Sequence, residues 1–446
     1  MTTSRPHIRQ LVILAGGQGT RLKQVTGDLP KPMALIGGIP VLEHQVRAAA
    51  RDGFEEVVFL TSYRSEVIES HFGDGSRWKV KFRYCLDESP LGTAGATLAA
   101  LDQLDERFLL LYGDVMHDVD LRQFAEFHCT RQEAAATLLV HPNDHPQDSD
   151  LVEMGDDARI TCFHGYPHAP GSFYRNVVNA GLYALTRSAL ALYAGIPGKQ
   201  DFAKDLFPRM VREGRALYGY FSREYIKDMG TPERLAMVNR HYEQGRIQEL
   251  HASHPVPAIF LDRDGTVIRQ VPFLSRADQV ELIEGAARAI RQIHDANRLA
   301  VLVTNQPVIA RGECSVHELE RIHGRMEHLL ATEAKTYLDA IYYCPHHPDS
   351  GFPGEVAALK IACDCRKPNT GMIRQAVPDL NIDLEHSWMI GDSMRDWQTA
   401  CNAGIQAMLV RTGEATAVEL AQLPPGRVCD DLQDAIDKIL KRSSPF

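Results

Sequence analysis

Short apolar runs alternate with helical patterns through both halves of the chain. Compact apolar runs bounded by turn residues lie at 11–15, 56–60, 108–112, 135–140, 258–262, 299–304, 340–344 and 387–392. Between them, segments such as 41–53 carry apolar residues at helical spacing and end at a glycine. Continuous apolar strands that alternate with helices are typical of parallel sheets buried on both faces. The pattern therefore predicts an α/β fold in each half.

The join between the halves lies near residue 250. A charged helical tail begins at 241 and leads into His254-Pro255-Val256-Pro257. Two prolines in three residues stop a helix and favour an extended connection. A chain of 446 residues is also too long for one ordinary domain. We therefore predict one domain over residues 1–250 and a second over residues 251–446.

Composition excludes some classes of function and indicates the cellular compartment. The formal net charge of −10 argues against a non-specific nucleic-acid binder, which needs a basic surface. No apolar run reaches the roughly 18–20 residues that span a membrane, and the N-terminal apolar stretch is too short for a secretion signal. Nine cysteines, an odd count in a long chain, fit a reducing compartment better than a disulfide scaffold. We expect a cytoplasmic protein with no nucleic-acid or membrane partner.

The first candidate site follows the strand at 11–15. The chain continues as Gly16-Gly17-Gln18-Gly19-Thr20-Arg21, and three glycines in four residues let backbone N–H groups approach phosphate oxygens closely. Arg21 adds a fork-shaped donor, and two prolines stiffen the loop that carries Lys31. The loop lacks the third glycine of a Rossmann fingerprint and the GK[ST] of a P-loop. A plain strand-to-helix turn would explain the glycines alone.

The complete string LAGGQGTRL…DLPKPM resembles the signature of the sugar-nucleotidyltransferase family, whose members make NDP-sugars from a sugar 1-phosphate and an NTP. The resemblance covers most of residues 8–245 and implies a Rossmann-like, GT-A-like mixed sheet. It implies that Arg21 and Lys31 are catalytic and that Asp114 and Asp228 bind Mg²⁺. It also implies substrate or phosphate contacts by Gly16, Gly17, Gly19, Thr20, Gly92, Asn179, Gly181 and Lys204.

These residue types suit the reaction of that family. Attack of a sugar phosphate on the α-phosphorus of an NTP brings two polyanions together, and Mg²⁺, Lys31 and Arg21 would offset their repulsion. Mg²⁺ prefers one or two carboxylates together with phosphate oxygens. One departure concerns the segment 201–208, where Ala203 stands at a position at which many relatives carry glutamate. Lys204 keeps the lysine of that Glu-Lys pair, but the contacts to sugar hydroxyls lose a carboxylate.

The second candidate site follows the strand at 258–262. Asp262 and Asp264 are two residues apart, so on an extended strand both carboxylates address one point at the edge of the sheet. Two carboxylates in that position indicate a cation, although such pairs are common on surfaces. The full string DRDGTV resembles the first motif of haloacid-dehalogenase-like (HAD) phosphatases, which implies a doubly wound parallel sheet. Three further motifs follow in that family's order, with Thr304-Asn305, Arg366-Lys367 and Asp392.

The HAD resemblance assigns a role to each of these residues. Asp262 would be the nucleophile that forms an aspartyl phosphate, and Asp264 would be the general acid and base. Mg²⁺ would be held by Asp262, by the carbonyl or carboxylate of Asp264, and by Asp392. The phosphoryl group would be held by Thr304, Asn305, Arg366 and Lys367. Pro307 and Val308 replace a small polar residue and a glycine of the usual motif, which alters the phosphate side of the site.

Three of the cysteines lie close to a histidine, ahead of Arg366. A Cys₃His set, which is typical of structural Zn²⁺, is available in Cys344, His346, Cys363 and Cys365. His347 is the rival ligand, and a chance grouping of buried thiols is the alternative. The CPHH…CDC loop resembles the zinc loop of heptose bisphosphate phosphatases, a single-domain branch of the HAD family whose ligand is the first histidine. The resemblance implies that zinc fixes Arg366 and Lys367 over the active site.

The two resemblances imply one bifunctional enzyme with Mg²⁺ at both active sites. The second domain would remove the 7-phosphate of D-glycero-D-manno-heptose 1,7-bisphosphate, and the first would transfer a nucleotidyl group to the heptose 1-phosphate. GTP is the favoured NTP, so GDP-heptose is the expected product. Two alternatives stay open. The first domain could be a nucleotide- or sugar-binding regulatory module without catalysis, or it could use another sugar such as mannose 1-phosphate.

Overall fold

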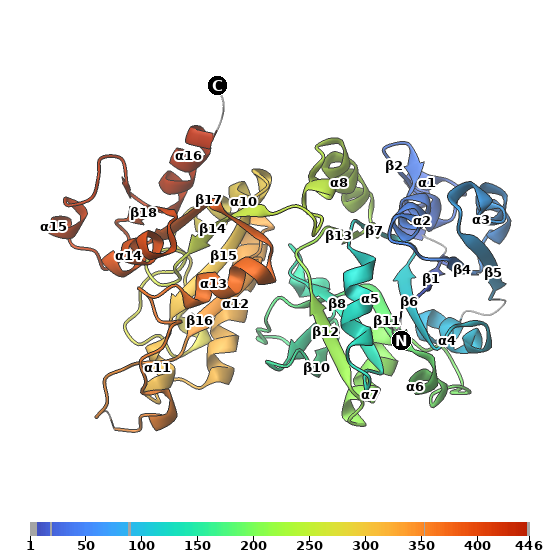
Figure 1. The fold of residues 1–446 in the computed structure, drawn as a ribbon, viewed down its shortest axis with the longest axis horizontal. Coiled ribbons are helices and arrows are strands. Elements are labelled where there is room, and N and C mark those ends of the chain that lie inside the picture. Colours follow the sequence, from blue (N-terminus) through green and yellow to red (C-terminus); the bar gives the residue numbers. More distant parts are fainter. Residues whose placement is uncertain (1–6, 18–19, 88–90, 352, 444–446) are drawn as a thin grey trace, which may run out of the picture. The chain divides into compact units, whose positions relative to one another are not determined.

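The computed structural model describes residues 7–17, 20–87, 91–351 and 353–443. They form two compact units (Figure 1). The first unit comprises residues 1–141, 152–165 and 178–253, and the second comprises residues 142–151, 166–177 and 254–446. The chain therefore enters each unit three times. Gly19, a predicted phosphate contact, lies outside the described residues.

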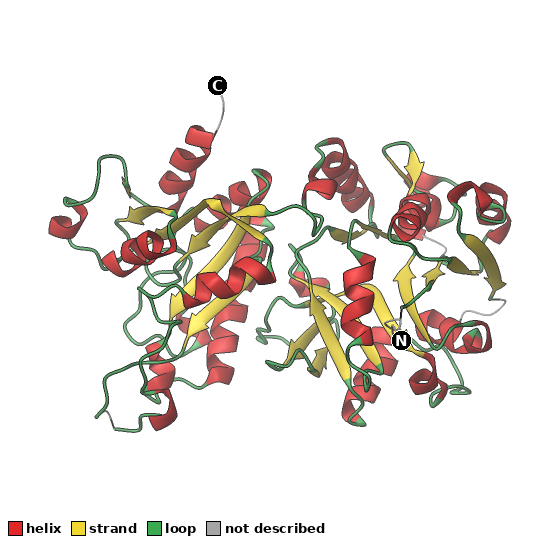
Figure 2. Cartoon of the chain, in the orientation of Figure 1, coloured by secondary structure: helices red, strands yellow, loops and turns green. Residues whose placement is uncertain are grey.

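A nine-stranded mixed sheet forms the centre of the first unit (Figure 2). Its strands are β1 (Gln10–Leu14), β4 (Glu56–Thr61), β5 (Lys81–Leu86), β6 (Arg107–Tyr112), β8 (Ala136–His141), β9 (Leu151–Met154), β10 (Ile160–His164), β11 (Val178–Thr186) and β12 (Leu217–Phe221). Strands β5, β4, β1 and β6 pair in parallel, whereas β11 runs antiparallel to β6 and β8. The predicted mixed α/β sheet is confirmed.

Helices and two small sheets complete the first unit. The helices are α1 (Lys23–Thr26), α2 (Val41–Arg51), α3 (Ser65–Phe72), α4 (Gly92–Ala99), α5 (Leu121–Cys129), α6 (Arg187–Ala191), α7 (Phe207–Arg212), α8 (Pro232–Glu243) and α9 (Arg246–Glu249). The small antiparallel sheets pair β2 (Leu35–Ile36) with β3 (Ile39–Pro40), and β7 (Val115–His117) with β13 (Ile226–Asp228). Helix α2 ends at Arg51, two residues before the predicted glycine stop, because Gly53 has a φ of 83° that no helix accommodates.

A six-stranded parallel sheet forms the centre of the second unit, in the order β16-β15-β14-β17-β18-β19. The strands are β14 (Val256–Leu261), β15 (Leu299–Asn305), β16 (Ala340–Cys344), β17 (Ile382–Gly391), β18 (Gln406–Val410) and β19 (Val428–Cys429). The helices are α10 (Ala286–Asp295), α11 (Pro307–Ala310), α12 (Val316–Ala334), α13 (Gly371–Asp379), α14 (Met394–Ala403), α15 (Ala417–Leu420) and α16 (Leu432–Ser443).

Helices cover both faces of this parallel sheet. Residues of α10, α12 and α16 share one apolar core with Ile259 and Leu261 of β14. Helices α13 and α14 contact β16, β17 and β18 but contribute nothing to that core. The predicted doubly wound sheet is therefore confirmed. Among the described residues, no helix is both long enough and apolar enough to cross a membrane.

The proline-rich join is part of a strand. Val256 and Pro257 belong to β14 and pair with Ile382 and Asp383 of β17. The pairing changes register between Pro257 and Ile259, and proline has no N–H with which to continue a regular ladder. Because β17 reaches back to this pairing, it begins at Ile382 rather than at the predicted residue 387.

A buried ion pair holds residues 166–177 within the second unit. The Arg175 guanidinium contacts Glu320 Oε2 at 2.7 Å and Glu327 Oε2 at 3.0 Å, and both glutamates lie on α12. The backbone N–H of Asn176 donates to the same Glu327 oxygen at 2.9 Å. Burial raises the pKa of Glu327, and the Arg175 charge opposes that shift. A segment from the first half of the sequence is thus tied to a helix from the second half.

Candidate active sites

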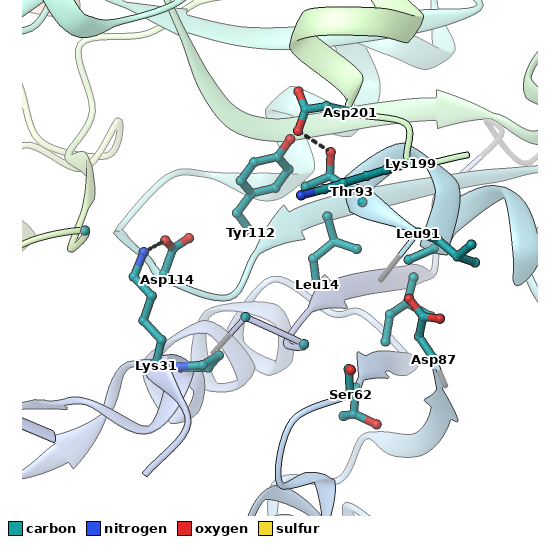
Figure 3. Close-up of a pocket in the computed structure, with 18 of the residues that line it drawn as sticks. Leu14, Lys31, Ser62, Asp87, Leu91, Thr93, Tyr112, Asp114, Lys199 and Asp201 are labelled. Atoms are coloured by element: carbon teal, nitrogen blue, oxygen red, sulfur yellow. Dashed lines mark hydrogen bonds and ion pairs between the residues drawn. The ribbon is translucent and has the colours of Figure 1, made fainter. Parts of the chain in front are cut away.

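A cavity of about 640 Å³ lies in the first unit, where β1, β4 and β6 end (Figure 3). Its lining residues are Leu14, Gly16, Gly17, Arg21, Lys31, Pro32, Leu60, Thr61, Ser62, Asp87, Leu91, Gly92, Thr93, Ala96, Tyr112, Asp114, Lys199, Asp201 and Gly230. The carboxyl edge of parallel strands is where open α/β sheets bind ligands. The structure therefore gathers six predicted residues around one space: Gly16, Gly17, Arg21, Lys31, Gly92 and Asp114.

The loop after β1 lies close against the neighbouring strand ends. A Cβ added at Gly16 would lie 3.0 Å from the Ser62 Cβ, so a larger residue there would push the loop away from β4. Thr20 opens a short 3₁₀ turn, and Arg21 lines the cavity from that turn. Backbone groups and a guanidinium thus border one space, an arrangement that suits phosphate oxygens.

Lys31 and Asp114 form an ion pair on the cavity wall (Figure 3). Lys31 opens a short 3₁₀ turn behind Pro30, whose extended backbone sets the direction of the turn. Asp114 lies two residues after the end of β6, and it lines the cavity. A carboxylate oxygen on the wall of this cavity fits a hard divalent cation, so Asp114 remains the predicted Mg²⁺ ligand of this site.

The second predicted ligand of the first site, Asp228, is held by Arg234 next to the lining residue Gly230, whose N–H donates to Asp228 Oδ1 at 3.0 Å. Its backbone is adjacent to Asp114, because the N–H of Met229 donates to the Asp114 carbonyl at 3.0 Å. Both carboxylate oxygens accept hydrogen bonds from Arg234 Nη1, at 2.8 and 2.9 Å. Asp228 is not among the lining residues, whereas Gly230, two positions on, is. Binding of Mg²⁺ by Asp228 stays a prediction that requires the carboxylate to leave Arg234.

Asn179 and Gly181 lie behind Tyr112 rather than on the cavity wall. Asn179 Nδ2 donates to the Tyr183 hydroxyl at 2.9 Å, and that hydroxyl donates to Tyr112 at 3.5 Å. A Cβ at Gly181, where φ is 73°, would lie 3.2 Å from the Tyr112 ring. Burial raises the pKa of Tyr112 well above its ordinary value, so its phenol stays protonated. The two predicted residues thus support a ring that reaches the cavity.

The segment around Ala203 meets the cavity at residues that sequence reasoning missed. Lys204 is exposed and is not among the lining residues. Lys199 and Asp201 line the cavity instead. Asp201 could have been noticed as a helix N-cap, since its side chain accepts from the N–H groups of the two residues that follow Phe202.

In the second unit, the end of β14 places Asp262 in a buried cluster of charges. Lys367 Nζ lies 2.7 Å from Asp262 Oδ1 and 2.6 Å from Asp396 Oδ1. Carboxylate oxygens of Asp262, Asp392 and Asp396 all lie within 4.8 Å of one another. Burial raises the pKa of Asp262 to about 6 and that of Asp392 to about 8, and the neighbouring aspartates add to both shifts. Three crowded carboxylates beside one lysine form an oxygen donor set that fits Mg²⁺.

The Asp264 carboxylate stands apart from that cluster. Arg263 holds it through Nε and Nη2, at 2.9–3.1 Å, and Gln306 Nε2 donates to it at 3.0 Å. Arg263 is itself 1% exposed, and its Nη2 also donates to Gln306 Oε1 at 2.8 Å. The predicted alternation does not apply here because β14 ends at Leu261, and the chain then turns. The Asp264 side chain thus pairs with Arg263, so of the two predicted Mg²⁺ ligands on this residue its backbone carbonyl stays the available one.

The remaining predicted phosphatase residues surround Lys367. Asn305 exchanges two hydrogen bonds with the Lys367 backbone, at 2.9 and 3.1 Å, and so fixes its position. The Thr304 hydroxyl, next to the end of β15, accepts from Gln306 Nε2 at 2.9 Å. Arg366 donates to the carbonyl of His346 at 3.2 Å. Pro307 occupies the first position of helix α11, where a missing N–H costs nothing.

The predicted zinc ligands come together. Sγ of Cys363 lies 3.5 Å from that of Cys344 and 3.2 Å from that of Cys365, and His346 Nδ1 lies 3.3 Å from Cys365 Sγ. Three sulfurs and one imidazole nitrogen are the donor set of a closed tetrahedral zinc site. Nδ1 of the rival His347 accepts from the Asp349 N–H at 3.2 Å. The geometry therefore fits the predicted set of Cys344, His346, Cys363 and Cys365.

Fold and sites together define a two-domain α/β enzyme that acts on phosphate groups. The family model described as nucleotidyl transferase matches residues 10–245, more than half of the chain, so the chain belongs to the nucleotidyl transferase family. A second model, described as HAD-hydrolase-like, matches residues 364–435. The chain thus joins a nucleotidyltransferase domain to a HAD-type phosphatase domain.

Relatives of known activity match each half separately. The D-glycero-beta-D-manno-heptose-1,7-bisphosphate 7-phosphatase of Haemophilus ducreyi is 43% identical over 163 residues, covering 36% of this chain and 87% of the relative. The mannose-1-phosphate guanylyltransferase of Mycobacterium tuberculosis is 33% identical over 231 residues, covering 51% of this chain and 62% of the relative. The crystal structure of the D,D-heptose 1,7-bisphosphate phosphatase from B. bronchiseptica with magnesium and phosphate shows 37% identity and a TM-score of 0.37, over 42% of this chain and 99% of that one.

Proposed function

We propose that this chain catalyses two consecutive steps towards a nucleotide-activated heptose. The phosphatase domain removes the 7-phosphate of D-glycero-D-manno-heptose 1,7-bisphosphate, and the other domain transfers GMP from GTP to the resulting heptose 1-phosphate. The observation that carries the proposal is the presence of two separate acid–cation pairs, Lys31–Asp114 and Lys367–Asp262. The name of the phosphatase relative supports the bisphosphate substrate, and the name of the guanylyltransferase relative supports the transfer of GMP. We assign the transfer to residues 1–250 and the hydrolysis to residues 251–446, in the cytoplasm, where NTPs are available.

In the hydrolysis, an oxygen of Asp262 attacks phosphorus, and the bond between phosphorus and the sugar oxygen breaks. Lys367 balances charge on Asp262 and on the phosphoryl oxygens. Asp264, carrying a proton, turns away from Arg263 and gives that proton to the leaving sugar oxygen. Water then attacks the aspartyl phosphate, Asp264 takes a proton from that water, and phosphate leaves with Asp262 restored. Mg²⁺, held by Asp262 and Asp392, would lower the negative charge around phosphorus.

In the transfer, a phosphate oxygen of the sugar 1-phosphate attacks the α-phosphorus of GTP. The bond from that phosphorus to the β-bridging oxygen breaks, and pyrophosphate leaves. Arg21 and Lys31 border the cavity and would stabilise the charge that develops on pyrophosphate. Asp114 would hold Mg²⁺, which screens the two polyanions from each other.

We also propose that Cys344, His346, Cys363 and Cys365 bind a structural zinc ion. The hydrogen bond from Arg366 to the His346 carbonyl links this loop to the residue next to Lys367. Zinc would therefore hold the loop that positions the cation of the phosphatase site.

A matrix of NTPs against sugar phosphates tests the two activities, with the wild-type chain, Asp114→Asn and Asp262→Asn side by side. GTP with heptose 1-phosphate should release pyrophosphate fastest, and heptose 1,7-bisphosphate should release phosphate. Asp114→Asn should abolish only pyrophosphate release, and Asp262→Asn only phosphate release. Loss of both activities in either variant would contradict the two-site proposal, and nucleotide binding without pyrophosphate would indicate a regulatory module.

A second candidate substrate for the transfer is mannose 1-phosphate. The guanylyltransferase relative is named for that sugar, and it matches this chain over 231 residues. The same matrix separates the candidates, because the preferred sugar 1-phosphate should show the higher kcat/KM with GTP.

A further inference from the structure

The nucleotidyltransferase cavity carries a carboxylate and an ammonium that the sequence motif does not supply. Position 203, where relatives have glutamate, is a buried alanine, and Lys204 is exposed outside the lining. Lys199 and Asp201 instead lie beside Thr93 on the cavity wall, away from Ser62 and Asp87 in the view of Figure 3. The cavity therefore has one carboxylate and one ammonium from residues just before positions 203 and 204 in the chain.

The loop that carries these two charges is held by its backbone. The N–H of Gln200 donates to the Leu91 carbonyl at 2.8 Å, and the Gln200 carbonyl accepts from Ala94 and Gly95 at 3.0 and 3.3 Å. Gly92, with a φ of 81°, allows this approach, since a Cβ there would lie 2.4 Å from the Gln200 oxygen. The loop thus lies against the start of α4, which fixes the backbone between Lys199 and Asp201. The Lys199 side chain itself is exposed and borders the cavity.

Asp201 is oriented before any ligand binds. Its Oδ2 accepts from the Thr93 hydroxyl at 2.8 Å, and its Oδ1 accepts from the backbone N–H groups of Ala203 and Lys204 at 2.9 and 3.2 Å. A carboxylate has about four acceptor positions, so one remains for a ligand. Among the described residues, the Lys199 ammonium has no ion-pair partner. One acceptor and one cation are thus available on the same wall.

We propose that Asp201 and Lys199 form the binding site for the sugar 1-phosphate, which rests on the proposed transferase function. Asp201 accepts a hydrogen bond from a sugar hydroxyl, and Lys199 pairs with the phosphate of the same molecule. The sugar end is favoured over the nucleotide base because the Tyr112 hydroxyl points toward Asp201 in Figure 3, and Tyr112 is two residues from Asp114, the predicted Mg²⁺ ligand. The residues that contact the sugar thereby move from positions 203 and 204 to positions 199 and 201.

Steady-state kinetics of pyrophosphate release, with GTP and heptose 1-phosphate varied in turn, test this assignment. The variants are Asp201→Ser, Asp201→Asn, Lys199→Met and Lys204→Met, with the exposed Asp102→Asn as the control. Serine caps a helix nearly as well as aspartate, and asparagine removes the charge alone. Asp201→Ser and Lys199→Met should raise KM for heptose 1-phosphate by roughly ten- to hundredfold, as expected for a lost hydrogen bond to a charged group. KM for GTP should stay within about twofold in both variants.

Three results would overturn the assignment. The first is a rise in KM for GTP instead of KM for the sugar phosphate. The second is wild-type kinetics in both Asp201→Asn and Lys199→Met. The third is a raised KM for the sugar phosphate in Lys204→Met but not in Lys199→Met. Phosphate release from heptose bisphosphate and the circular dichroism spectrum monitor folding of every variant. If Asp201→Ser does not fold, Asp201→Asn decides. Failure of the wild-type chain to release pyrophosphate with any sugar 1-phosphate would refute the proposed function itself, before any variant is compared.

Discussion

Replacing Lys367 by methionine should disable the phosphatase domain and destabilise it. The lysine is 4% exposed, and its ammonium lies 2.7 Å from Asp262 and 2.6 Å from Asp396, of which Asp396 is 1% exposed. Burial opposes the charge of Lys367, but the two aspartates raise its pKa above the ordinary value. Methionine keeps the apolar stem and leaves both carboxylates without the shared cation. Breaking a buried pair in this way costs about 3–5 kcal/mol, a large part of a typical domain stability of about 5–15 kcal/mol.

The assay combines denaturant unfolding in buffer without Mg²⁺ with phosphate release in Mg²⁺. Trp388 lies in β17 and packs in the apolar core, so its fluorescence reports unfolding of the phosphatase sheet. Loss of a preorganised cation should slow phosphate release by roughly 10²–10³-fold, while pyrophosphate release stays at the wild-type rate. The exposed Lys335→Met serves as the matched control and should change the free energy of unfolding by less than about 0.5 kcal/mol. A Lys367→Met variant within about 1 kcal/mol of wild type that still releases phosphate would refute the charge-balance reasoning.

Three further predictions concern metal, backbone and pH. Co²⁺ added to the metal-free chain should give sulfur-to-metal charge-transfer absorbance. The Cys363→Ser variant should show weaker absorbance and a lower melting temperature than wild type. A Cys363→Ser spectrum identical to that of wild type would contradict the zinc site. Gly92→Ala should cost about 1–3 kcal/mol of stability and raise KM for the sugar phosphate, because its Cβ would collide with the Gln200 carbonyl; wild-type melting would contradict this. Burial lowers the pKa of His128 to about 4 from an ordinary 6.5, so the unfolded chain binds the proton first, and stability is lost as pH falls below 6.5. From pH 7 to pH 5 the free energy of unfolding of wild type should therefore fall by about 2 kcal/mol more than that of His128→Gln, in parallel denaturant titrations; equal losses would contradict it.

The gathering of the phosphatase residues at one edge could be predicted from the sequence. Asp262, Thr304 and Asp392 each lie at or just after the end of an apolar run, and the runs form the neighbouring strands β14, β15 and β17. Because parallel strands end at the same edge, their last residues converge whatever the loops between them do. The grouping of the Cys₃His set could also be predicted, because few residue types serve as zinc ligands.

The direction of individual side chains beyond the strand ends could not be predicted. Asp264 was placed by strand alternation, but β14 has already ended there, and a buried Arg263 captures the carboxylate. Asp201 and Lys199 escaped notice because their importance depends on a backbone contact with α4, about a hundred residues away in sequence. Contacts of that range depend on tertiary packing, and no local pattern of hydrophobic and polar residues encodes them.

The three separate entries of the chain into each unit affect how the protein can be divided. A single proteolytic cut near residue 250 would release the phosphatase sheet without residues 142–151 and 166–177, which pack with it. Glu327 would then lose the Arg175 guanidinium and keep a carboxylate whose side chain is 3% exposed. Such a fragment would contain a buried carboxylate on α12 that has lost its cationic partner. Limited digestion should therefore yield a phosphatase fragment of reduced stability rather than two intact enzymes.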